Sequence, residues 1–307
     1  MNEETRSSQK IFLLGMVLSM TCWGFSWTSG KILSEYANPL TISFFRFAMT
    51  FASLILILVF AKIPMSIRKT GLLDLLMASA LISLYTYLFF KGLTVGKAGA
   101  GGILVTVLNP IISYVVMLII ARRKPSTTEF WGLSLGVLAG IVLLRLFSDT
   151  SALWSAGNIY FLLASFSWAA LSLVTARASR YGSPVTFSCW MYLVSTVLMF
   201  VLSDASAAVE LLGKTDAIFW GNMFFSSSIT TAGATTFYFV ATSKLGAGKA
   251  SSFIFLVPFS AALGAWIFLN EVPPVHSIIG GVLGIAAVYI LNIKKKAVVR
   301  PSAQERP

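Results

Sequence analysis

Charged residues, cysteine and histidine are all scarce in this sequence of 307 residues. Only 11% of the residues are charged and 57% are hydrophobic, whereas a soluble domain carries roughly 25% charged residues. An ordinary water-soluble core is therefore excluded. The two cysteines, Cys22 and Cys189, both lie inside apolar segments, so a disulfide framework built in loops is excluded as well.

The sequence also lacks the side-chain combinations that catalysis or metal binding requires. Its single histidine, His276, begins the last apolar segment and is expected at a membrane interface. One histidine and two separated cysteines form no metal-binding cluster. No apolar segment contains a carboxylate pair, a nucleophile beside a base, or a phosphate-cradling loop. We therefore expect no metal, no cofactor and no enzymatic activity.

Long apolar segments are what the sequence has in abundance. A membrane-spanning helix needs about 20 mainly apolar residues, because its backbone must satisfy its own hydrogen bonds in lipid. Ten segments fit this requirement, and the third and fifth are the weakest because charged residues crowd their ends. They cover residues 11–33, 40–61, 72–91, 98–121, 130–147, 154–176, 184–203, 217–243, 250–270 and 276–293. We therefore predict an all-α integral membrane protein with ten transmembrane helices.

The formal net charge of +12 would suggest a nucleic-acid partner in a soluble protein. Here the basic residues lie between apolar segments, so we expect the lipid bilayer and no nucleic acid as a partner. Most lysines and arginines fall in one set of alternate loops, and the other set contains only Lys31, Lys91, Lys97, Arg145 and Lys214. Because loops rich in Lys and Arg remain in the cytoplasm, we expect both termini there, with residues 1–10 and the basic residues 294–307 as cytoplasmic tails.

The second half of the chain repeats the first. Residues recur at an offset of about 145 positions, as in the pairs Trp23 and Trp168, Tyr36 and Tyr181, Pro39 and Pro184, and Pro110 and Pro258. The repeat divides the chain into a first unit at 11–147 and a second unit at 154–293, each with five predicted helices. Since five is odd, the second unit enters the membrane from the opposite side. Two inverted five-helix repeats are typical of secondary transporters, which bind their solute near the membrane midplane between the halves.

Two groups of residues carry a resemblance to a known family. The first half contains Trp23-Gly24-Phe25-Ser26, Lys31, Pro39 and Phe45-Arg46, and the second half contains Pro258, Leu269-Asn270-Glu271, Pro273 and Gly280. In this order, these residues resemble the EamA-type branch of the drug/metabolite transporter superfamily over nearly the whole chain. The sequence departs from the family pattern at Arg123, where the family often carries a glutamate as at Glu271. The second half also lacks counterparts of Lys31 and Arg46.

The resemblance implies an activity as well as a fold. It implies a central cavity lined by the first, third, fourth, sixth, eighth and ninth helices, and transport by alternating access. It also implies export of amino acids or other small metabolites across a bacterial inner membrane, with a small-molecule solute as the partner. Two alternatives remain open. One is a flippase for lipids or lipid-linked head groups on the same fold, and the other is a non-transporting membrane receptor or assembly subunit.

Aromatic side chains in these spans are the candidates for solute binding. We expect the cavity wall to include Trp23, Trp27, Tyr85, Asn109, Trp168, Tyr238 and Phe255. Trp23 and Trp168 stand out because they are mid-span and related by the repeat. Contact with lipid or with the membrane interface is the alternative for such aromatic residues. A wall with many rings and few charges suits an amphipathic solute.

Three charged residues are candidates for charge selection or gating: Lys31, Arg46 and Glu271. Arg46 is the only formal charge well inside a span, and intramembrane charges usually face a cavity or a partner. Because Arg46 lies about two turns from the outer end of its span, extension to the membrane surface is the alternative. Glu271 and Glu35 are its candidate ion-pair partners. No span contains a mid-span Asp, Glu or His, so we expect a facilitator or a weakly coupled exporter.

Glycine and proline mark candidate hinges and helix contacts. Glycine-rich loops precede the fourth and ninth spans, and each of these spans contains a proline. The candidate hinges are Gly101, Gly102, Gly248, Ala250, Pro110 and Pro258. Small residues every fourth position permit close helix contacts, and the fifth and tenth spans carry them at Gly132, Gly136, Gly140, Gly280 and Gly284. These contacts form either within the fold or across a homodimer interface, and the sequence leaves both interpretations open.

Overall fold

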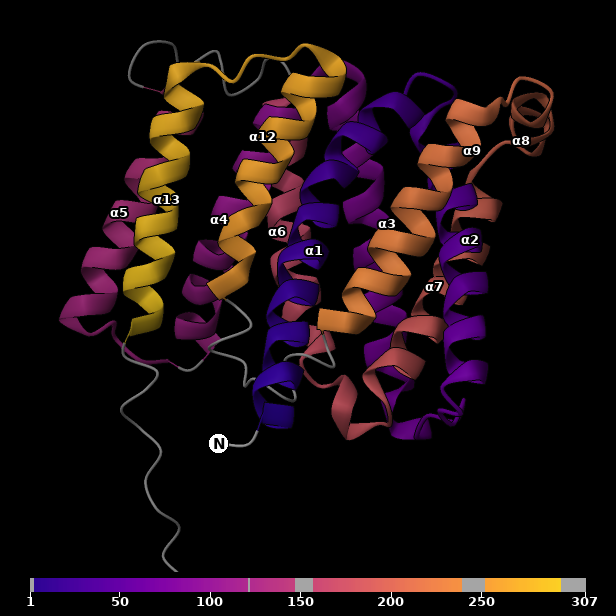
Figure 1. The fold of residues 1–307 in the computed structure, drawn as a ribbon, viewed down its shortest axis with the longest axis horizontal. Helices are drawn as coiled ribbons and strands as arrows, with labels where there is room; N and C mark the ends of the chain where they lie inside the picture. Colours follow the sequence, from indigo (N-terminus) through magenta and orange to yellow (C-terminus); the bar gives the residue numbers. More distant parts are fainter. Residues whose placement is uncertain (1–2, 121, 147–156, 239–251, 294–307) are drawn as a thin grey trace, which may run out of the picture.

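The computed structural model describes residues 3–120, 122–146, 157–238 and 252–293. Every regular element in this part of the chain is a helix (Figure 1). The first half contains α1 (Glu3–Leu33), α2 (Pro39–Phe60), η1 (Lys69–Gly71), α3 (Leu72–Val95), α4 (Ala98–Ile120) and α5 (Thr127–Leu143). The second half contains α6 (Asn158–Thr175), η3 (Ala178–Arg180), α7 (Pro184–Leu202), α8 (Ala205–Leu212), α9 (Ala217–Phe224), η4 (Phe225–Ala234), η5 (Ser252–Phe255), α12 (Leu256–Leu269) and α13 (Val275–Ile293).

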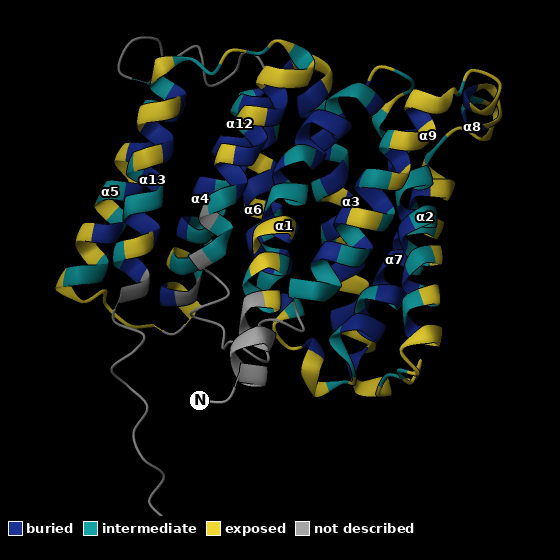
Figure 2. Ribbon diagram, viewed as in Figure 1, coloured by how far each residue is buried: buried dark blue, intermediate teal, exposed yellow. Residues whose placement is uncertain are grey.

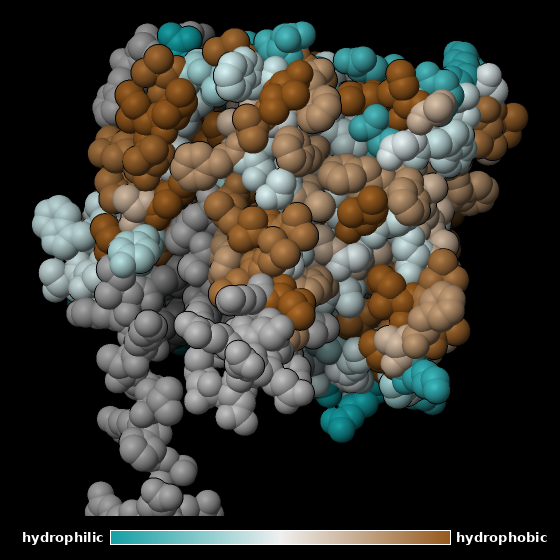
Figure 3. Space-filling model, in the orientation of Figure 1, coloured by the Kyte–Doolittle hydropathy of each residue, from teal (hydrophilic) through white to brown (hydrophobic). Residues whose placement is uncertain are grey.

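These helices confirm an all-α membrane fold. Within the described residues, six helices are long and apolar enough to cross a membrane, and α5, α12 and most of α13 are shorter apolar helices beside them. The predicted eighth span begins as α9 and continues directly into η4, which is a π-helix. Figure 3 shows hydrophobic side chains over the side of the bundle and hydrophilic ones at its two ends. This is the surface that a bilayer-spanning protein needs.

The two halves begin their second helices in the same way. The side chain of Asn38 accepts hydrogen bonds from two backbone N–H groups in the first turn of α2, which begins at Pro39. In the second half, Ser183 makes one such bond with the first turn of α7, which begins at Pro184. A capping side chain followed by proline satisfies amides that have no partner inside the helix. The repeat in the sequence therefore encodes the same local structure twice.

The two halves run through the bundle in opposite directions. The helix α1 begins, and α13 ends, at the same end of the molecule, which we call the proximal end; the opposite end is the distal end (Figure 1). The helix α1 runs from proximal to distal, whereas its counterpart α6 runs from distal to proximal. Packing partners follow the same exchange, since α1 packs on α12 and α6 on α4, while α2 packs on α7 and α5 on α13. When two inverted halves are related by a two-fold axis, each contact between them has a counterpart of this kind.

Glycines bring α5 and α13 close together. A Cβ atom added at Gly132 would lie 2.9 Å from the side chain of Leu291, and one added at Gly280 would lie 2.6 Å from that of Leu143. Larger side chains at these positions would push the two helices apart. These glycines therefore permit close packing within the chain, and a homodimer interface stays a prediction.

Serine hydroxyls join helices in the interior of the bundle, where burial is greatest (Figure 2). Ser79 on α3 donates to the carbonyl of Leu75 one turn earlier (2.8 Å) and to that of Met191 on α7 (3.2 Å). Ser195 on α7 returns a bond to the carbonyl of Ser79 (3.2 Å). Such bonds satisfy polar groups away from water and add to helix association in membranes. Here they connect a helix of the first half to a helix of the second.

Candidate functional site

Three aromatic side chains pack together toward the distal end of the bundle. Trp27 on α1 packs edge-on against Phe89 on α3, with ring centroids 4.7 Å apart, and against Phe161 on α6 at 5.8 Å. Their exposed fractions are 4%, 2% and 0%. We call these three residues the aromatic layer. Both halves contribute to it, because α1 and α3 belong to the first half and α6 to the second.

The helix α4 joins the aromatic layer through its glycines. A Cβ added at Gly101 would lie 2.6 Å from the ring of Phe161. One added at Gly102 would lie 2.5 Å from Ala261 on α12 and 3.1 Å from Trp27. Interiors packed this densely resist even one extra methyl group. Two of the predicted hinge residues therefore lie where α4, α12 and the aromatic layer meet.

Glu271 links the two halves on the distal side of the aromatic layer. Asn270 follows α12 with a left-handed backbone (φ 55°), a conformation that Asn adopts more readily than most residues. The carboxylate of Glu271 accepts hydrogen bonds from the N–H groups of Ala98 (3.3 Å) and Gly99 (3.1 Å) at the start of α4. Unpaired amides and the helix dipole both stabilise a carboxylate there. Glu271 thus fastens the end of α12 to the start of α4.

Lys31 makes a second link on the same side. Its ammonium group donates to the carbonyl of Leu93 (2.6 Å), near the end of α3, where helix carbonyls have no partner within the helix. A cation is favoured at a helix C-terminus by the dipole. Both distal candidates for gating, Lys31 and Glu271, are therefore bonded to the ends of helices from the first half. They hold the distal end of the bundle together.

Four of the predicted wall residues lie just proximal to the aromatic layer, on the helices that contribute to it. On α1 and α3 they lie about one turn away, and on α4 and α6 about two turns. They are Trp23, Tyr85, Asn109 and Trp168, each partly accessible, and we call them the proximal set. The rings of Tyr85 and Trp168 are 4.6 Å apart. Accessible side chains next to a buried layer are what we expect of an internal site that is closed at one end.

The remaining wall residues are placed less uniformly. Tyr238 packs against Trp23 with ring centroids 5.5 Å apart, and so lies beside the proximal set. Trp27, also predicted as a wall residue, belongs to the buried aromatic layer. Within the proximal set, Asn109 accepts a hydrogen bond from the hydroxyl of its own-helix neighbour Ser113 (3.2 Å). Phe255 ends η5, but its side chain lies outside the described part of the chain.

The other predicted hinge residues divide between helices and undescribed segments. Pro110 lies inside α4 and leaves that helix continuous. Pro258 is buried inside α12. Gly248 and Ala250 lie outside the described residues. The structure therefore places the four described hinge candidates within α4 and α12, two helices that pack against each other.

Arg46 points into the bundle from α2. Its guanidinium carbon lies 5.4 Å from the ring centre of Phe89 and 5.7 Å from that of Phe90. One of its N–H groups lies 3.4 Å from the hydroxyl of Thr231 on η4. No carboxylate among the described residues lies within ion-pairing distance of it. Two aromatic faces and one long hydrogen bond are its contacts.

The contacts between α2 and η4 show which way Arg46 extends. Both segments run from the distal to the proximal end (Figure 1), and Thr50 on α2 meets the carbonyl of Ser227 on η4 (3.5 Å). Arg46 lies one turn before Thr50, yet its partner Thr231 lies one turn beyond Ser227. The side chain therefore extends toward the middle of the span and away from the nearer distal end. This is opposite to the direction of a snorkelling side chain.

Sequence reasoning missed the π-helix η4. π-helices are rare and occur frequently at functional sites. The hydroxyl of Thr231 donates to the carbonyl of Ser226 (2.7 Å), and that of Thr235 to the carbonyl of Thr230 (3.4 Å). Both acceptors lie five residues back, which matches the register of a π-helix. The available signal was the five serines and threonines at 226–231, interrupted only by Ile229, which are unusual within an apolar span.

Sequence reasoning also missed a pair of equivalent contacts at the two ends of the bundle. At the distal end, Tyr36 donates from its hydroxyl to Asp216 ahead of α9 (2.8 Å). At the proximal end, Tyr181 donates to Asp74 in the first turn of α3 (2.7 Å). Each half therefore contacts the other through the same kind of tyrosine–aspartate hydrogen bond. The repeat revealed the tyrosines, but the aspartates are offset by 142 positions and not 145, so the pattern hid them.

Hydrogen bonding shifts the pKa values of groups in these contacts outside the spanning helices. The N–H of Phe219, and then the hydroxyl of Tyr36, hold the pKa of Asp216 below its ordinary value. The bond to Asp216 raises the pKa of Tyr36, and the bond to Asp74 raises the pKa of Tyr181. At neutral pH Asp216 is therefore ionised and both tyrosines are neutral, which are the states that these bonds require.

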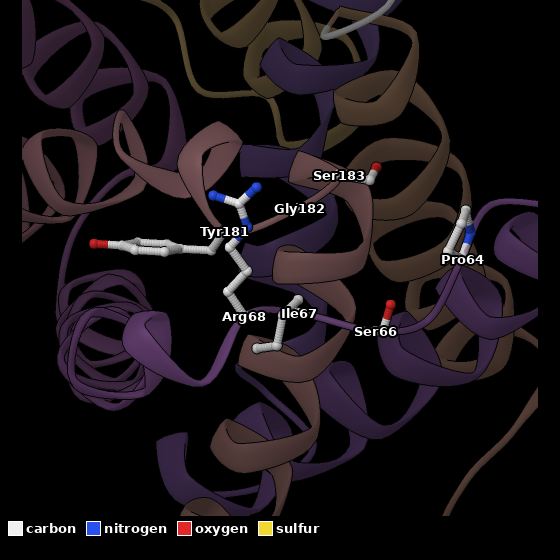
Figure 4. Close-up of a pocket in the computed structure, with 7 residues that line it drawn as sticks. All are labelled: Pro64, Ser66, Ile67, Arg68, Tyr181, Gly182 and Ser183. Carbon is white, nitrogen blue, oxygen red and sulfur yellow. The ribbon is translucent and has the colours of Figure 1, made fainter.

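A pocket of about 340 Å³ lies at the proximal end (Figure 4). The connections from α2 to η1 and from η3 to α7 form it, with lining residues Pro64, Ser66, Ile67, Arg68, Tyr181, Gly182 and Ser183. The backbone N–H of Arg68 donates to the carbonyl of Tyr181 (2.8 Å) and joins the two connections. The pocket contains no member of the proximal set. It belongs to the proximal contact between the halves.

Comparison with known proteins shows the family. The model of the EamA-like transporter family matches the chain twice, at residues 10–146 and 155–293. The chain belongs to the EamA-like transporter family. A crystal structure shares the fold, with a TM-score of 0.61 over 93% of this chain and 96% of that chain, at 14% identity. The family model thus matches each half of the chain separately, in agreement with the repeat in the sequence.

Similar proteins occur in bacteria, archaea and plants, and the bacterial and archaeal ones are named as transporters. YoaV of Bacillus subtilis, an uncharacterised transporter, is 24% identical over 91% of this chain and 95% of its own. An uncharacterised transporter of Archaeoglobus fulgidus is 22% identical over 91% of this chain and 96% of its own. A WAT1-related chloroplast protein of Arabidopsis thaliana is 25% identical over 66% of this chain and 50% of its own. This EamA-like chain is accordingly a membrane transporter.

Proposed function

We propose that this transporter exports small metabolites, such as amino acids, by alternating access between its two halves. The observation that carries the proposal is the exchanged pair of contacts, Tyr36 with Asp216 at the distal end and Tyr181 with Asp74 at the proximal end. A molecule with the same closing device at both ends can release one end while the other stays closed. Exchange between the two arrangements would carry an internal site from one side of the membrane to the other.

The proximal set is the proposed solute-binding wall, together with Tyr238. In the described conformation the buried aromatic layer and the bonds of Lys31 and Glu271 close the distal side. A solute would reach the wall from the proximal side once the contact of Tyr181 with Asp74 is released, and would leave after the aromatic layer parts. Aromatic walls with few charges suit amphipathic solutes. Gly101 and Gly102, which admit the close approach of α4 to this layer, are the proposed hinge in the first half.

The charges of the connecting segments support an orientation for export. The proximal connections carry Arg68, Lys69, Arg177 and Arg180, among other basic residues. Segments of this kind remain in the cytoplasm. The proximal end is therefore the proposed cytoplasmic side of a bacterial inner membrane. Loading from the proximal side and release at the distal side then give export.

Flux through the purified protein in liposomes tests the proposal. Liposomes are loaded with labelled amino acids and other small metabolites, and at least one solute should leave faster than from protein-free liposomes. Fluorescent phospholipids in the same membranes should cross no faster than without protein. Release of no solute would contradict the proposal. Accelerated crossing of lipid without release of solute would favour a flippase instead.

A further inference from the structure

The charge of Arg46 is not neutralised by any group in the described part of the chain. Its contacts are the faces of Phe89 and Phe90 and the hydroxyl of Thr231. An unpaired cation is costly inside a membrane protein, and contact with aromatic faces offsets only part of that cost. Partial accessibility of Arg46 leaves room for another partner. An anion bound beside it would offset the remaining cost.

Two tyrosines supply further hydrogen-bond donors beside Arg46. The ring of Tyr85 on α3 lies 6.1 Å from that of Phe89, which Arg46 contacts. The ring of Tyr192 on α7 lies 5.5 Å from that of Phe47, the residue that follows Arg46. Neither hydroxyl makes a hydrogen bond to another described residue. An oxyanion bound beside Arg46 would therefore meet the guanidinium group, and the two phenol O–H groups are the further candidate donors. These donors come from both halves of the transporter, since α2 and α3 belong to the first and α7 to the second.

We infer that Arg46 binds a carboxylate of the transported solute. The inference rests on the proposed transport function and names the class of solute that it serves. A carboxylate matches the planar guanidinium group with two parallel hydrogen bonds. A phosphate or a dicarboxylate would need a second cation, and none among the described residues interacts with Arg46. Lys31, on the neighbouring helix α1, is instead bonded to the carbonyl of Leu93.

The aromatic rings around Arg46 indicate which chemical groups the solute carries besides its carboxylate. The ring of Tyr85 lies 6.1 Å from that of Phe89 and 4.6 Å from that of Trp168, so aromatic surface runs from Arg46 into the proximal set. An apolar or aromatic body can pack on these rings while its carboxylate meets the guanidinium group. The class is therefore small amphipathic monocarboxylates, namely amino acids with apolar or aromatic side chains and the corresponding organic acids. Met191 stands at the repeat position of Arg46, so the repeat supplies one carboxylate site and not two.

Binding to the purified protein in detergent tests this inference without requiring transport. Three probes share a phenyl ring and differ in their charged groups: L-phenylalanine, 3-phenylpropionate and 2-phenylethylamine. Thermal unfolding is followed at increasing concentrations of each probe. The two carboxylates should stabilise the wild-type protein, since ligands that bind the folded state raise its unfolding temperature. The amine, which has no carboxylate, should not.

Variants locate the effect at Arg46. Arg46→Gln should raise the apparent Kd of both carboxylates at least tenfold, because charge-assisted hydrogen bonds are the strong ones. Arg46→Lys should keep part of the affinity, and Tyr192→Phe should lose less than Arg46→Gln. Lys97→Gln is the matched control, since it removes one positive charge from an exposed position. It should bind both carboxylates as the wild type does.

Several outcomes would overturn the inference. They are wild-type binding of the amine as strong as that of the carboxylates, no wild-type binding of either carboxylate, and unchanged carboxylate binding by folded Arg46→Gln protein. If Arg46→Gln does not fold, Arg46→Lys and Tyr192→Phe carry the same test. Carboxylate binding without any flux in liposomes would contradict the transport proposal alone. Flux confined to solutes without a carboxylate would contradict this inference alone.

Discussion

Gly102 shows how closely helices approach at the level of the aromatic layer. A Cβ atom there would lie 2.5 Å from Ala261 on α12 and 3.1 Å from Trp27 on α1. Helices of both halves thus meet at a point where only a hydrogen atom fits. Dense packing of this kind transmits small displacements instead of absorbing them. Any separation of α4 from α12 at this level would therefore break the contacts of this residue.

Replacing Gly102 with alanine should destabilise the transporter by about 1–3 kcal/mol, because the added methyl group has no space. Gly221 on α9 is the matched control, since nothing lies within 4 Å of a Cβ added there. Gly221→Ala should be neutral or slightly stabilising, as alanine is the better helix former. Thermal unfolding of both variants in the same detergent measures the difference. Equal unfolding temperatures would show that the neighbours of Gly102 accommodate a methyl group without loss of stability, which would contradict the prediction.

Arg46 shows how far sequence reasoning reaches at a single residue. Its position inside an apolar span identifies an intramembrane charge, but the direction of its side chain depends on Thr231, 185 positions away. The bond from Glu271 to the start of α4 joins residues 173 positions apart. Local patterns of hydrophobicity do not specify which distant helix packs beside a given residue. The candidate residues could therefore be named from the sequence, and their partners could not.

At the scale of elements, the ends of α4 and α12 differ although the repeat makes them equivalent. Each is followed by a residue with a left-handed backbone, Arg122 (φ 48°) after α4 and Asn270 (φ 55°) after α12. The next residue is Arg123 in one case and Glu271 in the other. Arg123 pairs with Glu129 at the start of α5 in its own half (2.7 Å). Because a cation is disfavoured at a helix N-terminus, Arg123 is unsuited to make at the proximal end the bond that Glu271 makes at the distal end.

Glu271→Ala should loosen the distal end of the bundle. The N–H groups of Ala98 and Gly99 would lose their acceptor, a loss worth about 1 kcal/mol at a helix start. Hydrogen–deuterium exchange read by mass spectrometry should become faster in the first turn of α4. Glu35→Ala, which removes the same charge from an exposed position at the same end, should leave that exchange unchanged. Equal exchange rates in the two variants would argue against the cap.

The distal contact should also depend on pH in a defined direction. The pKa of Asp216 is lowered, chiefly by the N–H of Phe219, so its contribution is present above the ordinary pKa of aspartate and is lost as pH falls through the lowered value. The pKa of Tyr36 is raised, chiefly by its bond to Asp216, so its contribution is lost only as pH rises through the raised value. Labelling of a cysteine introduced at the distal end, divided by its labelling in the unfolded protein at the same pH to remove the effect of thiol ionisation, should therefore be flat around neutral pH and increase at both extremes. Tyr36→Phe should remove the alkaline increase, and a wild-type profile that changes near neutrality would count against the contact.

The sequence predicts the helices well because their determinants are local. Apolar length marks the spans, and a capping residue before proline marks the starts of α2 and α7. The π-helix η4 is different, because the hydrogen-bond register of a helix responds to what packs against it. Ser53 on α2 bonds the hydroxyl of Ser228 on η4 (2.8 Å), beside the contact of Thr50 with Ser227. These contacts couple the polar run of η4 to a helix of the other half, which no local pattern reveals.

At the scale of the molecule, inversion of the two halves accounts for both its symmetry and its departures from symmetry. The tyrosine–aspartate contacts appear once at each end, as exchange of the halves requires. Arg46 and Glu271 have no equivalent in the other half. In the proposed transport cycle, the shared contacts would open and close the two ends in turn, which is an exchange between two arrangements. The unshared residues give that exchange a carboxylate site and a firmer distal closure.

Crosslinking tests most directly the claim that closure alternates between the two ends. Cysteines replace Tyr36 and Asp216 in one variant and Tyr181 and Asp74 in another, in a background without the two native cysteines. Each pair is joined by a short, reducible thiol crosslinker, and exchange of a labelled transported solute across liposomes is measured before and after. The account predicts that joining either pair stops exchange and that cleaving the linker restores it. Exchange that continues at full rate with either end joined would contradict the account.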